Sequence, residues 1–151
     1  REEVMGVLNP TGRTVMSGTY TGHLVAVMGA LACQREIAKP GFYERLNALA
    51  ERLYAGMTGI LARTGTPGVV QGIGARFGLY FGITDKVRSY RDAVRFDRDA
   101  EVRFIRSCLE RGLYLHDYAH RTPMHHGFSA AHTEADVDRA LEIMEEALRK
   151  G

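Results

Sequence analysis

The sequence predicts an α+β fold in which helices pack on one face of a small sheet. Apolar residues recur at helical intervals in four segments of the chain. These segments lie at about 22–39, 42–64, 99–111 and from 133 onward. Short runs rich in β-forming residues stand between them, at 69–71, 77–81, 113–115 and 128–130. The expected order is therefore helix, helix, two strands, helix, two short strands and helix.

The first forty residues are expected to form a turn-rich segment followed by one helix. Asn9-Pro10-Thr11-Gly12 is a turn signal, and a short helix or coil before it and an extended stretch after it lead to Ser17. From Gly22 to about Lys39 the residues are mostly apolar, which predicts a largely buried helix. Pro40-Gly41 ends this helix.

The later elements follow from equally local signals. Residues 42–64 carry one apolar stripe, and Gly65 is a suitable C-terminal stop. Gly72-Ile73-Gly74 stands before a strand rather than a helix, so it indicates a bulge or a tight link and not a dinucleotide-binding loop. Thr133-Glu134-Ala135-Asp136 begins the last helix as a capping box, with Asp in place of the usual Glu.

A polar segment at 84–98 contains four arginines, Arg88, Arg91, Arg95 and Arg98. It is either a solvated surface loop or the rim of a site that attracts anionic substrates. Acidic residues are interspersed among the arginines and no nucleic-acid-binding module is apparent, so nucleic acid is not an expected partner.

The composition is that of an ordinary globular domain. The chain has 151 residues, of which 45% are hydrophobic and 25% charged, with a formal net charge of +2. Such a chain suits one domain with a sizeable core, and it has no apolar run long enough to cross a membrane. Cys33 and Cys108 lie far apart without metal-ligand spacing, which favours a reducing compartment and a cytoplasmic protein.

The segment from Ser17 to Gly22 is the first candidate site. Two glycines, Gly18 and Gly22, bracket hydroxyl residues, and an apolar helix is expected to follow at once. A helix start offers free N–H groups and a partial positive charge, so a phosphate fits there. The alternative is a glycine-rich turn in which Thr19 or Thr21 only caps the helix.

Several segments in the same order resemble one enzyme family. They lie at 17–22, 40–46, 76–81, 109–115 and 127–138. The first resembles the Gly-Thr-(Leu/Phe)-(Ser/Thr)-Gly-Asn-Pro segment of class III pyridoxal-phosphate enzymes, and the whole chain is similar to the glutamate-1-semialdehyde aminomutase-like branch of the aminotransferases. The sequence departs from that pattern at His23-Leu24, where the family has Asn-Pro.

The resemblance implies a fold-type I pyridoxal-phosphate transferase, of which this chain is the C-terminal part. Residues 1–38 would end the large cofactor-binding domain, and residues 39–151 would form the small α+β domain. Thr19, with Gly18, would bind the phosphate of the cofactor held by the neighbouring subunit of a homodimer. The lysine that forms the Schiff base is expected upstream of residue 1, so no catalytic residue is assigned within the chain.

A second candidate site is the histidine-rich stretch between His116 and His126. From the residues alone, it is either a metal site or a loop whose histidines bond backbone groups. The resemblance implies that this stretch borders the substrate pocket, with His116, Asp117 and His125 as pocket residues. The family has Ala-Pro where His116-Asp117 stands and Glu where His125 stands. A substrate other than glutamate 1-semialdehyde is therefore expected.

Two functions follow from these expectations. The first is an aminotransferase or aminomutase that uses pyridoxal 5'-phosphate on a small amino donor and acceptor. The second is a non-catalytic α+β domain that binds a metal or an acidic ligand through its histidine loop.

Overall fold

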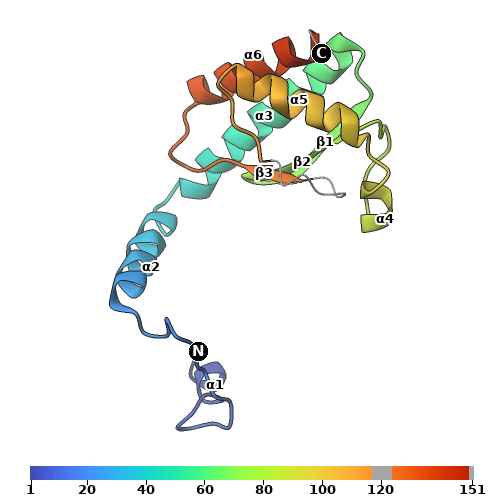
Figure 1. Ribbon diagram of the computed structural model, residues 1–151. Coiled ribbons are helices and arrows are strands. Elements are labelled where there is room, and N and C mark those ends of the chain that lie inside the picture. Colours follow the sequence, from blue (N-terminus) through green and yellow to red (C-terminus); the bar gives the residue numbers. More distant parts are fainter. Residues whose placement is uncertain (117–123, 150–151) are drawn as a thin grey trace. The chain divides into compact units, whose positions relative to one another are not determined.

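The computed structural model describes residues 1–116 and 124–149, and the chain divides into two compact units (Figure 1). The first unit is Arg1–Pro40 and the second is Gly41–Gly151. The division falls close to the predicted boundary at residue 38. The assignment of the first unit to a large cofactor-binding domain stays a prediction.

The first unit contains a short helix, α1 (Glu2–Met5), and a longer one, α2 (Leu24–Ile37). The predicted start of α2 at Gly22 is wrong, and so is the alternative in which Thr19 or Thr21 caps this helix. Gly22 has a φ of +75°, which a right-handed helix does not accommodate, so the helix begins two residues later. His23 is the N-cap, and its Nδ1 accepts a hydrogen bond from the Ala26 amide at 3.3 Å.

None of the residues of α2 is buried within the described part of the chain. Leu24 is 72% exposed and Val25 is 74% exposed. The apolar sequence of α2 predicts a buried helix, but the described residues do not cover it.

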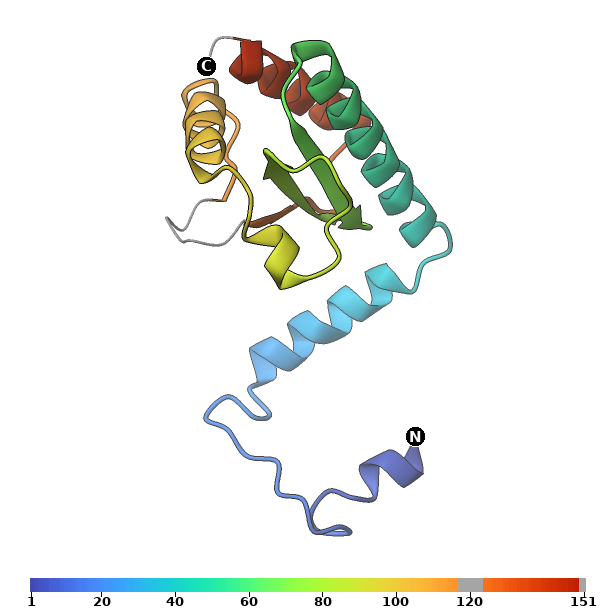
Figure 2. The same ribbon diagram turned by 90° about the vertical axis from the view of Figure 1, so that its right-hand side faces the viewer.

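The second unit places its long helices on one face of a sheet (Figures 1 and 2). Its elements are α3 (Phe42–Thr64), β1 (Gly68–Ile73), β2 (Arg76–Phe81), α4 (Tyr90–Ala93), α5 (Arg98–Glu110), β3 (His125–Gly127) and α6 (Glu134–Arg149). The three strands are antiparallel in the order β1-β2-β3. Helix α3 packs on β1 and on α6, while α5 packs on β2 and on α6. This confirms the predicted α+β class.

The glycines between β1 and β2 form a tight hairpin, as the sequence predicts. Ile73 pairs with Arg76, and Gly74 at the turn has a φ of +52°. The Tyr54 hydroxyl on α3 donates to the carbonyl oxygen of Gly74 and lies 3.1 Å from that of Arg76. Helix α3 therefore holds the turn from which Arg76 begins the central strand.

The third strand differs from the predicted one. No strand forms at 113–115 or at 128–130, and His125–Gly127 pairs with β2 instead. Leu115 is buried and Phe128 packs against the core, so the apolar residues of both segments serve burial rather than strand pairing. The polar segment at 84–98 also contains a short helix, α4, which a capping box between Ser89 and Asp92 begins.

The core lies between β2 and the helices. Phe77, Leu79 and Phe81 of β2 are buried, and the Phe81 ring lies 5.2 Å from the ring of Phe104 on α5. Cys108 is fully buried, and burial raises the pKa of its thiol to about 12. Both cysteines are free, and the cytoplasmic location stays a prediction.

Helix α3 packs against α6 and is hydrogen-bonded to it. Arg52 donates two hydrogen bonds to the Asp138 carboxylate, at 2.6 and 2.7 Å. The predicted capping box of α6 is present, because the Thr133 amide donates to Asp136 and the Asp136 amide donates to the Thr133 hydroxyl.

No helix among the described residues is both long enough and apolar enough to span a membrane.

Two glycines on α3 provide a test of the α3–α6 packing. A Cβ on Gly56 would overlap the Leu141 side chain of α6, whereas a Cβ on Gly59 meets only the flexible end of Arg63. Alanine gains up to about 1 kcal/mol in helix propensity at either position. Overpacking costs about 1–3 kcal/mol, so Gly56→Ala should be less stable than Gly59→Ala by that amount. Urea unfolding of the two variants measures the difference, and equal stabilities would contradict the close approach.

The hydrogen bonds of Tyr54 provide a second test. Tyr54→Phe removes the hydroxyl that holds the hairpin and should lower the free energy of unfolding by about 1 kcal/mol. Tyr43→Phe on the same helix is the matched control, because the described chain offers its exposed hydroxyl no hydrogen bond. Chemical unfolding of both variants checks the prediction, which fails if the two substitutions have the same effect.

Candidate functional site

The turn before α2 is ordered by two successive backbone hydrogen bonds. The Thr21 amide donates to the Gly18 carbonyl oxygen at 2.9 Å, and the His23 amide donates to the Tyr20 carbonyl oxygen at 3.0 Å. A Cβ on Gly18 would lie 3.1 Å from the Thr21 hydroxyl oxygen, so glycine makes room for that side chain. Thr19 therefore lies in the middle of a constrained turn.

The hydrogen-bond donors of Thr19 are not used within the described residues. Thr19 is exposed, and neither its amide nor its hydroxyl bonds any residue within the described ranges. No aspartate or glutamate occurs between Glu3 and Glu36, whereas Arg13 and Arg35 fall in that interval. The turn thus offers donors to an anion in a stretch without carboxylates.

The turn, rather than the helix end, carries this capacity. Because the His23 imidazole already accepts from the Ala26 amide, one of the free N–H groups at the start of α2 is satisfied. Four residues separate Thr19 from the first residue of α2. The predicted contribution of the helix N-terminus to the site is correspondingly reduced.

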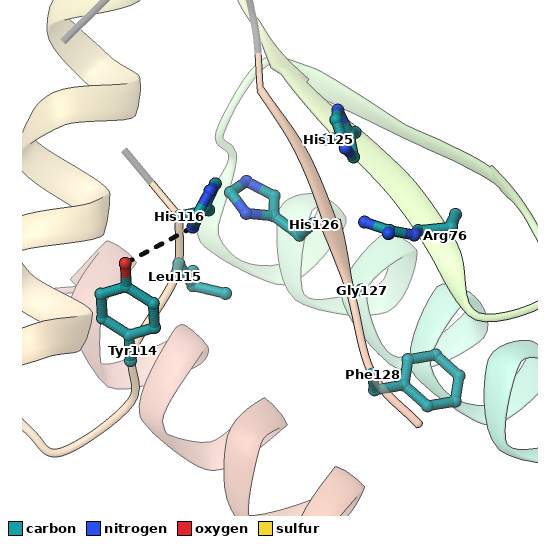
Figure 3. Close-up of a pocket in the computed structure, with 8 residues that line it drawn as sticks. All are labelled: Arg76, Tyr114, Leu115, His116, His125, His126, Gly127 and Phe128. Atoms are coloured by element: carbon teal, nitrogen blue, oxygen red, sulfur yellow. Dashed lines mark hydrogen bonds between the residues drawn. The ribbon is translucent and has the colours of Figure 1, made fainter. Parts of the chain in front are cut away.

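A separate cavity lies beside β3, within the second unit (Figure 3). Its volume is about 510 Å³. It is lined by Arg76, Tyr114, Leu115, His116, His125, His126, Gly127 and Phe128. Basic and aromatic side chains thus dominate its wall, and none of the described lining residues is acidic.

Two of the predicted pocket residues, His116 and His125, line this cavity. His116 Nδ1 lies 3.4 Å from the Tyr114 hydroxyl oxygen. Asp117, the third predicted residue, lies outside the described residues. His132 has a structural role, because its Nδ1 accepts a hydrogen bond from the Ser129 amide at 3.2 Å just before α6.

His126 is a lining residue that the sequence placed in the histidine-rich stretch but did not assign to the pocket. It is 5% exposed, its ring lies 5.5 Å from that of Phe77, and its Nδ1 has no hydrogen-bond partner within the described structure. Burial, and to a smaller extent the charges of His116 and His125, lowers the pKa of its imidazole to about 4. His126 is therefore neutral at physiological pH. Its pairing opposite Phe77, whose side chain points into the core, explains its burial.

Arg76 is a further lining residue, which the sequence did not single out. It pairs with Gly127, and its Cδ would lie 3.0 Å from a Cβ at that position. The absence of a side chain at Gly127 lets the arginine stem cross the edge strand. The guanidinium makes no ion pair or hydrogen bond within the ranges that the structure describes. Figure 3 shows Arg76 and His126 at the same cavity, with the His126 ring directed toward His116.

The described residues offer little to a metal ion. No group of three or more histidine, cysteine, aspartate or glutamate side chains in 1–116 and 124–149 is placed to hold one. The side chains of Asp117 and His120 fall outside those ranges. The metal-binding alternative gains no support from the described residues.

Comparison with known proteins finds solved structures with a similar fold. No protein-family profile matches the sequence. An omega-transaminase from Sphaerobacter thermophilus is 24% identical with a TM-score of 0.76, over 99% of this chain and 34% of that one. A transaminase with PLP bound is 19% identical with a TM-score of 0.73, over 99% of this chain and 33% of that one. A glutamate-1-semialdehyde-aminomutase from Pseudomonas aeruginosa PAO1 is 21% identical with a TM-score of 0.66, over 97% and 33%.

The chain spans about a third of the length of the structures it matches. These structures confirm, at the level of fold, the resemblance that the sequence motifs indicate. The fold of this chain is that of about one third of a class III pyridoxal-phosphate transaminase. The similar structures include a glutamate-1-semialdehyde aminomutase.

Proposed function

We propose that this chain is the C-terminal portion of an aminotransferase or aminomutase that depends on pyridoxal 5'-phosphate. The observation that carries the proposal is the match of 99% of the chain, at a TM-score of 0.76, to an omega-transaminase. The substrate would be an amino acid, or an amino-aldehyde or keto compound. When bound, pyridoxal phosphate supplies an electron sink that lets an amino group leave one carbon and join another.

The lysine that holds the cofactor would come from outside this chain. Lys39 is exposed and pairs with Glu36 at 2.6 Å, and Lys86 is also exposed. Neither has the buried setting in which a lysine becomes a nucleophile at neutral pH. Lys150 lies outside the described residues. The contribution of this chain would therefore be to position the cofactor and the substrate.

Thr19 would bind the cofactor phosphate, with Gly18 shaping the turn. The exposed hydroxyl and amide of Thr19 suit a phosphate oxygen, because hydrogen bonds to an anion are stronger than those between neutral groups. The carboxylate-free stretch around the turn favours the same charge. These features fit the phosphate group of pyridoxal phosphate.

The cofactor that Thr19 binds would belong to the neighbouring subunit of a homodimer. The exposed apolar side chains of Leu24 and Val25 support a contact with protein outside the described residues. Such a clamp would make each active site depend on two copies of the chain.

The cavity beside β3 would form part of the substrate pocket. His116 and His125 line it in the described structure, and Asp117 follows His116 directly in the sequence. Imidazole side chains can bind a substrate carboxylate or carry a proton to and from a substrate.

The phosphate clamp predicts a loss of cofactor affinity when Thr19 is truncated. Thr19→Ala removes one charge-assisted hydrogen bond, whose typical strength corresponds to a 10- to 100-fold rise in Kd. Titrating the apoenzyme with pyridoxal phosphate, followed by the visible absorption of the bound cofactor, measures the change.

Two variants control this experiment. Thr19→Ser keeps a hydroxyl and should retain most of the affinity. Thr21→Ala alters the same turn without touching the proposed phosphate ligand, so its Kd should stay within a factor of about three, which is under 1 kcal/mol. An unchanged Kd for Thr19→Ala would reject the clamp, and a holoenzyme whose absorption does not respond to any amino donor would reject the proposed function.

A further inference from the structure

We propose that β3 is a strand released by acid, because protonation of the buried imidazole of His126 detaches the strand from β2. Residues of β3 form part of the wall of the cavity beside it, so release of the strand would open that cavity. This inference goes beyond the proposed function and does not depend on it, since it concerns only the packing and titration of residues within the second unit.

Strand β3 is the shortest strand of the described sheet. It contains three residues and pairs with β2 alone, whereas β1 pairs with β2 over six residues. The Phe128 amide extends the attachment of β3 by donating to the Ala75 carbonyl oxygen at 3.2 Å. Segments with few hydrogen bonds open at a lower cost in free energy than a whole domain. β3 can therefore open while β1 and β2 stay paired.

The closed position of β3 removes the His126 imidazole from water. The residue is 5% exposed, and its Nδ1 is buried with no hydrogen-bond partner within the described structure. A neutral imidazole carries a proton on one nitrogen, whereas the imidazolium form carries a proton on both. Protonation would therefore leave Nδ1 as a donor on a charged ring, with neither water nor an acceptor beside it. Burying an unpaired charge is strongly unfavourable, so the imidazolium form favours the open strand.

The side chains around His126 do not compensate a positive charge. The titratable and charged groups that line the cavity with it are His116 and Tyr114 after α5, His125 on β3 and Arg76 on β2 (Figure 3). None of the described lining residues is acidic, and the nearest ring on β2 is that of Phe77, 5.5 Å away. Burial, followed by the charges of the neighbouring histidines, lowers the pKa of His126 from its ordinary value of 6.5 to about 4.

The direction of the pH effect follows from this lowered pKa. Above pH 6.5 the imidazole is neutral in both the open and the closed state, and β3 keeps its full stability. As the pH falls from 6.5 toward 4, the open state binds the proton and the closed state does not, so the open population grows. Hydrogen bonds from Arg63 and Arg149 hold the pKa of Glu145 at about 2, so the ion pair between α3 and α6 stays intact in this interval.

Amide hydrogen exchange of the 151-residue chain, followed by NMR at pH 7.5 and pH 4.5, tests the proposal. The Phe128 amide reports on β3. The Gly82 amide, which donates to the Pro67 carbonyl oxygen at 2.8 Å, reports on the end of the β1–β2 pair. After correction for intrinsic exchange rates, the protection of Phe128 should fall on the order of 50-fold at the lower pH, and that of Gly82 by less than about threefold.

Matched substitutions on β3 assign the effect to one imidazole. His126→Phe keeps a ring beside Phe77 without a titratable nitrogen, so the protection of the Phe128 amide should no longer depend on pH. His126→Leu is a smaller neutral replacement with the same expected result. His125→Gln removes the exposed histidine of the same strand, and most of the pH dependence should remain.

The proposal is overturned if the Phe128 amide is equally protected at both pH values or if His126→Phe keeps the loss of protection. It is also overturned if the Gly82 amide loses protection in parallel, which would mean that the whole sheet unfolds. A His126 ring that titrates near pH 6.5 in the unmodified chain, while the Phe128 amide stays protected, would equally reject it. None of these measurements involves the cofactor, so their outcome is independent of the Thr19 titration.

Discussion

The packing of β2 against the helices is the constraint on which the second unit depends. β2 is the central strand, and its side chains at Phe77, Leu79 and Phe81 are buried beneath the helices. Because side chains alternate along a strand, this burial directs Arg76 to the opposite face. β3 takes its register from β2, so the same burial places His126 on the core side and His125 on the open side. The cavity at the edge of the sheet is a consequence of that register.

Local signals were sufficient wherever a few neighbouring residues determine the structure. The stripe of α3, its stop at Gly65, the hairpin at Gly74 and the cap at Thr133 all depend on contacts within one or two turns of chain. The third strand depends on pairing with residues about fifty positions away, and its sequence, His125-His126-Gly127, contains no β-forming residue. Apolar runs were predicted as strands in its place, because burial in a loop and burial in a strand select the same residue types.

The residues of the candidate cavity also differ in how far the sequence predicts them. His116 and His125 were predicted as pocket residues from the family resemblance, and both line one cavity. Arg76 was missed because only the antiparallel pairing with Gly127 brings it there. His126 was placed in the histidine-rich stretch but not assigned to the pocket, because its burial follows from its place opposite Phe77 and not from its neighbours in the chain. Helix α2 begins later than predicted because Gly22 has a positive φ, which the apolar pattern does not reveal.

The cavity beside β3 and the proposed phosphate clamp at Thr19 rely on different physics. In the cavity, Arg76 brings a full charge, whereas burial closes His126 Nδ1 to solvent. In the turn, the exposed Thr19 offers only neutral donors, for which water would compete with a phosphate. Protein that covered Leu24 and Val25 would also remove water near Thr19 and strengthen those hydrogen bonds. Assembly and phosphate binding would then be coupled, as a clamp completed by a second subunit requires.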